Sequence, residues 1–183
     1  MDNNRYALII IDIINNFDFT HGSTLAKKTL QIVQPINHLK EHFNTRNWPV
    51  IFINDHYNLW QANLEKIVTF CRNEKSDPIF KQLLPDDDDY FLIKPKHSAF
   101  YGTALTILLH QLKVNTLILT GIAGNICVLF TANDAYMREF KIVVPSNCIT
   151  SVDEDDNRYA LVMMKNVLKA SIEPIDMQNL LIL

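Results

Sequence analysis

The sequence predicts an α/β fold in which a central parallel sheet of about six strands carries helices on both faces, giving three Rossmann-like layers. Short runs of Ile, Val and Leu without polar alternation are typical of strands that are covered on both faces. These runs alternate with longer segments of helical period, which indicates successive βαβ units. The 183 residues, 48% of them hydrophobic, can bury one sizeable core, so we expect a single domain over residues 1–183.

Six apolar runs of six or seven residues are the expected strands. In chain order they are YALIIID (6–12), PVIFIN (49–54), DYFLIK (89–94), NTLILTG (115–121), KIVVPS (141–146) and ASIEPI (170–175). Four segments of helical period lie between them, over about 25–43, 103–113, 125–140 and 153–168. The region from 55 to 84 is mixed in pattern and predicts no single element.

The composition excludes several classes of protein. The net charge is −3 and the seventeen basic residues are scattered, so we expect neither a nucleic-acid nor a membrane partner. The beginning of the chain has no basic leader pattern and no apolar run reaches about 18 residues, which predicts a soluble, cytoplasmic protein. Three cysteines without CxxC spacing fit neither a disulfide framework nor a zinc site. No GxGxxG or GxxxxGK[ST] motif occurs, so we expect no cofactor and a small-molecule substrate.

Three polar residues stand at the carboxyl ends of expected strands, where open parallel sheets bind ligands. Asp12 ends the first run, Lys94 ends the third, and Cys127 follows the turn after LILTG. Lys94 and Cys127 are about one βαβ unit apart, which favours neighbouring strands at a spacing of ~4.8 Å. Asp12 belongs to the first strand, which doubly wound sheets place centrally. We therefore expect the three side chains to converge.

Such a trio suits nucleophilic chemistry. The beginning of a helix and a nearby ammonium can bring a thiol pKa from about 8.5 down to ~3.5–7.5, so we expect Cys127 to be an activated thiolate. A buried Asp12 needs a partner, and it would either pair with Lys94 or take the thiol proton. Backbone N–H groups of the turn would form an oxyanion hole.

Each residue also has a structural interpretation. Free cysteine is among the most buried residue types, so Cys127 taken by its position alone is as readily a core residue as a nucleophile. Cys71 and Cys148 have no comparable turn or basic neighbour and are expected to be structural. Asp12 alone suits a helix cap, and Lys94 alone suits a solvated strand end. The convergence of the three favours an active site.

Three segments carry a resemblance to a known family. ALIIIDIINNF, KPKHSAFYGTAL and TGIAGNICVLFTANDAYMREF resemble the isochorismatase-like cysteine hydrolases, in the same order and with similar spacing, from about Tyr6 to Val144. That family includes nicotinamidases, N-carbamoyl amide hydrolases, ureidoacrylate amidases and isochorismatases. The resemblance implies an enzyme that assembles as a homo-oligomer, a dimer or larger.

The resemblance also implies roles for individual residues. Cys127 would attack an amide carbon, Asp12 would act as general base and then as acid, and Lys94 would help to hold both charges. A cis peptide bond would join Ile122 and Ala123. The backbone N–H groups of Ala123 and Cys127 would be the oxyanion donors.

The chain departs from parts of the family. Metal-binding nicotinamidases carry Asp-x-His after the second strand, but Asn54 stands where that aspartate would be, so we expect no metal. Gly124 stands where relatives often have threonine. Family members sandwich planar substrates between aromatic groups, which nominates the substrate-binding residues. These are Phe17, Trp60, Phe100 and Tyr101, each of which packs in a core or an interface as readily.

The leading hypothesis is a cysteine hydrolase that cleaves the C–N bond of a small amide or carbamoyl compound through a thioester intermediate. One alternative is an isochorismatase-type enol-ether hydrolase, in which Asp12 donates a proton and Cys127 is a bystander. A second is a non-catalytic small-molecule or redox thiol protein on the same fold.

Overall fold

In the computed structural model, residues 5–176 form a six-stranded sheet whose pairings are all parallel. The order is β3-β2-β1-β4-β5, with β6 also paired to β4. The strands are β1 (Tyr6–Ile11), β2 (Val50–Asp55), β3 (Tyr90–Lys94), β4 (Thr116–Ile122), β5 (Lys141–Val143) and β6 (Ile149–Thr150). The predicted α/β class and parallel sheet are confirmed.

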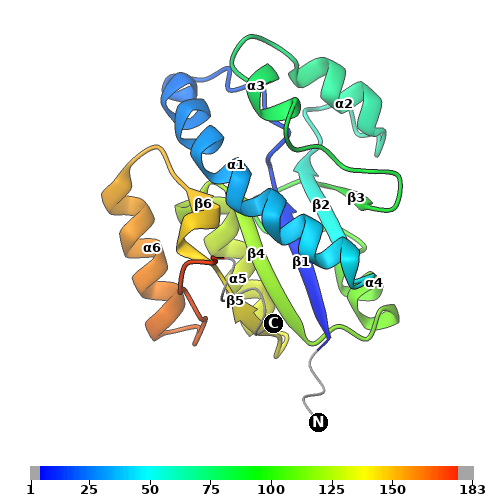
Figure 1. Ribbon diagram of the computed structural model, residues 1–183, viewed down its shortest axis with the longest axis vertical. Helices are drawn as coiled ribbons and strands as arrows, with labels where there is room; N and C mark the ends of the chain where they lie inside the picture. Colours follow the sequence, from blue (N-terminus) through cyan, green and yellow to red (C-terminus); the bar gives the residue numbers. More distant parts are fainter. Residues whose placement is uncertain (1–4, 177–183) are drawn as a thin grey trace.

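Helices cover both faces of this sheet (Figure 1). The helices are α1 (Gly22–Thr45), α2 (Leu64–Cys71), α3 (Asp77–Phe80), α4 (Leu105–Gln111), the π-helical turn η1 (Gly124–Val128), α5 (Leu129–Tyr136), the short 3-10 turn η2 (Ser146–Cys148) and α6 (Glu154–Asn166). One core lies between the sheet and α1, α2 and α3. The other lies between the sheet and α4, α5 and α6.

The central strand β1 shows why its sequence lacks polar alternation. Successive side chains of a strand point to opposite faces. Leu8 and Ile10 enter the core under α1, whereas Ala7, Ile9 and Ile11 enter the core under α4 and α5. All five are fully buried, so a polar residue at any of them would lose water without gaining a partner.

Some element boundaries differ from the prediction. The run at 170–175 contributes a single bridge, from Ser171 to Val143, instead of a strand. The sixth strand is β6, which is only two residues long and therefore leaves no periodic signal. The helix expected over 125–140 is divided between η1 and α5. The mixed region contains α2 and α3.

The winding of the chain indicates where a ligand would bind. From β1 the chain moves outward to β2 and β3, and α4 then returns it to β4 on the other side of β1. Ligands of open parallel sheets bind where the winding reverses, at the carboxyl ends of the strands. Here that point lies between β1 and β4, beside Asp12 and the turn that leads to Cys127.

The expectation that Lys94 and Cys127 follow neighbouring strands is wrong. β3 is an edge strand, and β2 and β1 separate it from β4. Three inter-strand spacings amount to about 14 Å. Sequence separation did not reveal the strand order, because the helix that follows a strand can lead either to the adjacent strand or to a strand on the far side of β1.

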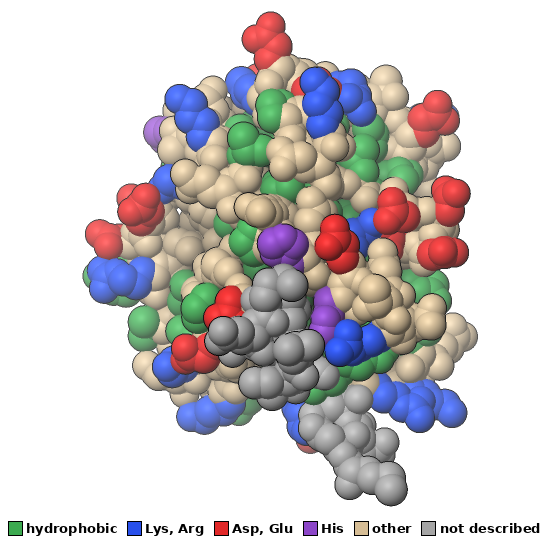
Figure 2. Space-filling view, in the orientation of Figure 1, with side chains coloured by type: hydrophobic (Ala, Val, Ile, Leu, Met, Phe, Trp, Pro, Cys, Tyr) green, Lys and Arg blue, Asp and Glu red, His purple; other side chains and the backbone are tan. Residues whose placement is uncertain are grey.

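The described residues show neither a membrane-spanning helix nor, on the face in view, a basic area. Within residues 5–176, no helix is long and apolar enough to cross a membrane. On the face in Figure 2, acidic and basic side chains are interspersed without a continuous basic area, so this face lacks the footprint typical of nucleic-acid binders.

Gly121, the position in β4 paired with Ile11, offers a test of the β1–β4 junction. Its φ is +104°, and a Cβ atom there would lie 2.1 Å from the Ile11 carbonyl oxygen. We expect Gly121→Ala to lower the free energy of unfolding by about 3 kcal/mol or more in urea denaturation. Gly102→Ala is the matched control, since its φ is also positive but its Cβ meets only the Pro95 side chain, at 2.9 Å. Equal losses in both variants would contradict this reading of the junction.

Candidate active site

The structure brings Asp12, Lys94 and Cys127 together. The Lys94 Nζ lies 2.8 Å from the Asp12 Oδ2 and 3.5 Å from the Cys127 Sγ. Asp12 is 6% exposed and Lys94 2% exposed, so both charges are almost entirely withdrawn from water. The convergence predicted from the strand ends is present, although Lys94 reaches it from the edge of the sheet.

Backbone contacts fix the two charged residues. Asp12 follows β1 with a φ of +52°, and its N–H donates to the Ile53 carbonyl oxygen at 3.0 Å. Its Oδ1 accepts the Asp55 N–H at 2.9 Å, which ties the ends of β1 and β2 together. Lys94 Nζ also donates to the Lys96 carbonyl oxygen at 3.2 Å. Each charged group is therefore held by the ends of more than one strand.

The turn before Cys127 is equally fixed. The peptide bond from Ile122 to Ala123 is cis, as the resemblance implied. The Ala123 carbonyl oxygen accepts from the N–H groups of Ile126 at 3.0 Å and Val128 at 3.2 Å. The π-helical turn η1 therefore begins directly at the end of β4 and carries the thiol toward Lys94.

The electrostatics of the thiol differ from the expectation of an activated thiolate. Burial, and then the negative charge of Asp12, raise the pKa of Cys127, while the Lys94 ammonium opposes them only in part. For Lys94, burial would lower the pKa, but the charges of Asp12 and Cys127 outweigh it and the net shift is upward. The direction of this shift is opposite to the one expected from the sequence, because that expectation counted the helix start and the ammonium but neither burial nor the charge of Asp12.

Residues 6–179 match the Isochorismatase domain family. The chain belongs to the isochorismatase family. It is 60% identical over 166 residues to an uncharacterized isochorismatase family protein, YaaI, of Bacillus subtilis strain 168, covering 91% of this chain and 92% of that protein.

Two solved structures of similar fold carry more specific names. The nicotinamidase PncA from Bacillus subtilis has a TM-score of 0.71 and 27% identity, covering 92% of this chain and 99% of that one. The N-carbamoylsarcosine amidase from Thermoplasma acidophilum has a TM-score of 0.70 and 25% identity, covering 93% and 96%. We classify the protein as an isochorismatase-family hydrolase.

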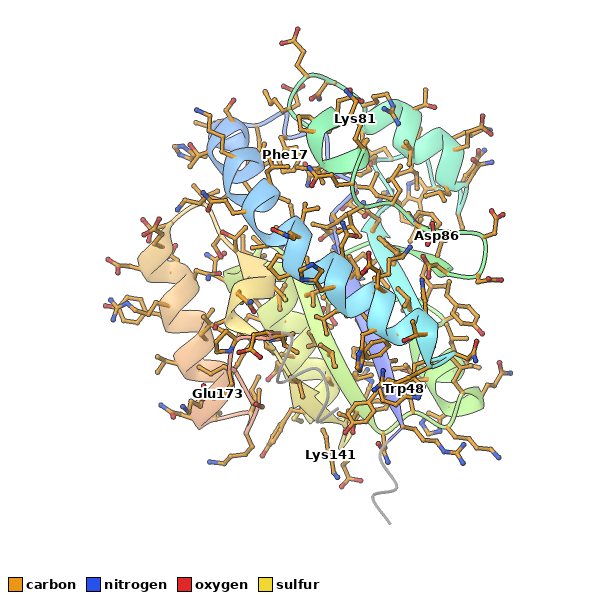
Figure 3. The ribbon with its side chains drawn as sticks, in the orientation of Figure 1. Phe17, Trp48, Lys81, Asp86, Lys141 and Glu173 are labelled. Atoms are coloured by element: carbon orange, nitrogen blue, oxygen red, sulfur yellow. The ribbon has the colours of Figure 1, made fainter. Side chains whose placement is uncertain are left out.

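The four nominated aromatic residues fall into two groups. Phe17 is fully buried in the core near the first turns of α1 (Figure 3), and Phe100 is buried against Phe140. Neither offers a face to a substrate, so we leave both out of the proposed binding surface. Trp60 is 67% exposed and Tyr101 61% exposed. The Trp60 ring stacks on that of His56, with centroids 4.0 Å apart, which holds it in place.

The metal site of some family relatives does not fit this chain. Both ends of the buried Asn54 side-chain amide are engaged by Ile14, whose N–H donates to Oδ1 at 3.1 Å and whose carbonyl oxygen accepts from Nδ2 at 2.6 Å. Within residues 5–176, no group of three or more His, Cys, Asp or Glu side chains is arranged to hold a metal ion. We derive no step through a metal.

The structure adds one residue to the site that the sequence did not single out. His97 Nδ1 lies 4.0 Å from the Cys127 Sγ. It stands three residues after Lys94, within the KPKHSAFYGTAL segment that carries the family resemblance. Its place in that segment was the one feature of the sequence that could have indicated a position near the site. By contrast, Cys71 and Cys148 are fully buried, and burial raises the pKa of Cys148 to about 12.

Gly124 also has a physical explanation. A Cβ atom there would lie 2.2 Å from Asn157 Oδ1 of α6. The Ser151 hydroxyl donates to that same Oδ1 at 2.8 Å and accepts the Asn125 N–H at 3.0 Å. Asn157 and Ser151 thus fill the space that a side chain at position 124 would need, and they fix the turn that carries the nucleophile.

The sign of the thiol pKa shift can be tested by alkylation. Asp12→Asn removes a charge that raises the Cys127 pKa, so more thiolate forms at a given pH. We expect iodoacetamide to alkylate Cys127 about tenfold faster at about pH 7.5, the effect of roughly one pKa unit. Lys94→Met removes the opposing charge and should slow the reaction. Peptide mass spectrometry reads both rates against Cys148 in the same sample, and slower alkylation in Asp12→Asn would contradict the assignment.

The contact between Gly124 and α6 can be tested by a double-mutant cycle. Gly124→Ala should displace Asn157 and lower the free energy of unfolding. In Asn157→Ala the obstructing amide is absent, so adding Gly124→Ala to that variant should cost less, with a coupling of about 1 kcal/mol or more. Urea denaturation of the four proteins measures the coupling. Additive losses would show that the two positions do not compete for the same space.

Proposed function

We propose that this protein is a cysteine-dependent amidohydrolase that cleaves the C–N bond of a small amide or carbamoyl substrate through a thioester on Cys127. The observation that carries the proposal is the arrangement of a partly buried thiol 3.5 Å from an ammonium that is paired with a carboxylate at 2.8 Å. A carboxylate, an ammonium and a thiol in contact supply a base, a fixed positive charge and a nucleophile.

In the proposed first half-reaction, one proton moves from the thiol to Asp12 and then from Asp12 to the departing nitrogen. Cys127 Sγ bonds to the substrate carbonyl carbon while the thiol proton passes to Asp12. Lys94 stays protonated and balances the negative charge that moves through the site. The N–H groups of Ala123 and Cys127 are proposed to hold the oxyanion, an interaction typically worth about 10²–10³ in rate per donor.

Collapse of the tetrahedral intermediate completes this half. The C–N bond breaks, and Asp12 returns its proton to the departing nitrogen, which leaves as ammonia or an amine. A thioester between the acyl group and Cys127 remains. Water then hydrolyses the thioester, releasing the acid and restoring the thiol.

Three further observations support the substrate class, the place where the substrate binds and the compartment of the protein. The similar structures named nicotinamidase and N-carbamoylsarcosine amidase are amide-type hydrolases by name. Trp60 and Tyr101 are exposed aromatic groups on loops that follow β2 and β3, suited to a planar substrate. All three cysteines are free, which suits a cytoplasmic, reducing compartment.

A screen of small amides and carbamoyl compounds for ammonia release tests the proposal. With any substrate found, Cys127→Ala should lose at least about a thousandfold in kcat/KM because the nucleophile is gone. Cys148→Ala is the matched control and should retain turnover once folded. Intact mass spectrometry of a slow substrate should show an acyl adduct on Cys127. Full turnover of an enol ether by Cys127→Ala would instead support the reading in which the cysteine is a bystander.

A further inference from the structure

Lys94 belongs to the edge strand β3, yet its ammonium lies beside a thiol that follows β4. Because β2 and β1 separate these strands, β3 and β4 are about 14 Å apart. The Lys94 side chain crosses this gap to Asp12 and ends 3.5 Å from the Cys127 Sγ. That distance depends on how the segment after β3 is held against the element that carries Cys127.

The segment after β3 lies along one face of η1 and α5. Residues 127, 131, 134 and 138 are spaced by four, three and four positions, which places their side chains on the same side of a helix. Each of them contacts the segment from 94 to 100. Cys127 Sγ contacts Lys94 Nζ, Thr131 Oγ1 accepts the Ala99 N–H at 3.0 Å, the Asp134 carboxylate accepts the Ser98 hydroxyl, and the Arg138 guanidinium lies over the Phe100 ring, 4.8 Å from its centroid.

Asp134 makes the strongest kind of contact in this row. The buried Ser98 hydroxyl donates to Asp134 Oδ2 and accepts the Phe100 N–H at 3.2 Å, so it fixes the backbone that follows it as well. Asp134 Oδ1 accepts from Arg138 Nη1 at 3.1 Å, so both carboxylate oxygens are engaged. A hydrogen bond to an ionised carboxylate is roughly twice as strong as one between neutral groups. Asp134 is therefore the main anchor of the segment on α5.

The anchored segment in turn holds the Lys94 ammonium. Lys94 Nζ donates to the Lys96 carbonyl oxygen at 3.2 Å, and Lys96 stands two residues before Ser98. This carbonyl and the Asp12 carboxylate, at 2.8 Å, are the oxygen atoms that direct the ammonium toward the sulfur. If Ser98 moved away from α5, the Lys96 carbonyl would move with it, and one of these two contacts would be lost.

We propose that Asp134 is a positioning residue: by holding Ser98 against α5, it keeps the Lys94 ammonium beside the Cys127 sulfur. Asp134 contacts no reacting atom and acts through Ser98 and the Lys96 carbonyl oxygen. Its consequence for turnover rests on the proposed function. Its consequence for the thiol does not, and it can be measured without a substrate.

The effect of removing Asp134 has a sign that identifies the positioning role. Loss of a negative charge would by itself make the Cys127 thiol easier to ionise. Displacement of Lys94 would do the opposite, since its ammonium lowers the pKa of Cys127. The charged and titratable groups that face Cys127 are Asp12 at the end of β1, Lys94 at the end of β3 and His97 in the segment after it. The positioning role therefore predicts a slower reaction of the thiol, and a simple charge effect predicts a faster one.

Alkylation of Cys127 by iodoacetamide, read by peptide mass spectrometry, measures this sign. We expect Asp134→Ala to slow the reaction about fivefold at about pH 7.5, the effect of about 1 Å of added separation at an effective dielectric constant of about 20. Asp134→Asn keeps an oxygen that accepts from Ser98 and should retain most of the rate. Asp155→Ala is the matched control, since Asp155 is an exposed helical aspartate paired with Arg158 at 2.9 Å, and it should leave the rate unchanged.

Two combinations of variants test the route of the effect. Ser98→Ala removes the other partner of the contact, so it should slow alkylation to a similar extent, and adding Asp134→Ala should slow it no further. In Lys94→Met the ammonium is already absent, so Asp134→Ala should have no effect there. The buried Cys148 in the same samples reports unfolding, and Ser98→Ala provides the test if Asp134→Ala does not fold.

Three results would overturn the positioning role. These are an unchanged rate in folded Asp134→Ala and Ser98→Ala, a faster rate in either, or the same slowing by Asp134→Ala in Lys94→Met, which would show that the effect reaches the sulfur through η1. Failure of the proposed function gives a different result. Cys127→Ala would then keep its turnover of an amide substrate, while the alkylation rates would still decide the role of Asp134.

Discussion

The buried ion pair between Asp12 and Lys94 is the contact on which the rest of the site depends. Each charge is almost fully removed from water, and a buried charge left without its partner typically costs about 3–5 kcal/mol. The pair joins the centre of the sheet, where Asp12 follows β1, to its edge, where Lys94 ends β3. The Asp55 N–H adds the end of β2. Three strand ends are therefore locked together before any chemistry occurs, and Cys127 meets this assembly from the other side of β1.

The same pair contributes to the raised pKa of the Cys127 thiol. Burial raises this pKa most, and the charge of Asp12, the carboxylate that is proposed to receive the thiol proton, acts in the same direction. A thiolate beside Asp12 would place two negative charges against one ammonium. In the proposed mechanism the proton therefore leaves the sulfur as the C–S bond forms, when negative charge moves onto the substrate oxygen. Lys94, whose pKa is raised, would serve as a fixed positive charge in that step.

The sequence predicted those features that depend on local pattern. The strands could be predicted because packing on both faces excludes polar residues. The convergence of Asp12, Lys94 and Cys127 could be predicted because these residues stand at strand ends. The strand order could not be predicted, since spacing does not say on which side of β1 a strand lies. The burial of Phe17 could not be predicted either, because it depends on how the chain turns into α1. His97 was missed because its contact with the sulfur depends on anchors to α5, which the linear sequence does not display.

The nucleophile thus has two unlike sides. Asp12 and Lys94 are buried, and in the proposed mechanism Asp12 exchanges a proton with the thiol and the departing nitrogen while Lys94 keeps its charge. His97, whose Nδ1 lies 4.0 Å from the sulfur, is exposed to solvent. In the first half of the proposed reaction, Asp12 takes the thiol proton and gives it to the departing nitrogen, so it is a carboxylate again when water attacks the thioester. Lys94 keeps its charge in both halves, so the ion pair that holds the strand ends together is restored each time Asp12 releases its proton.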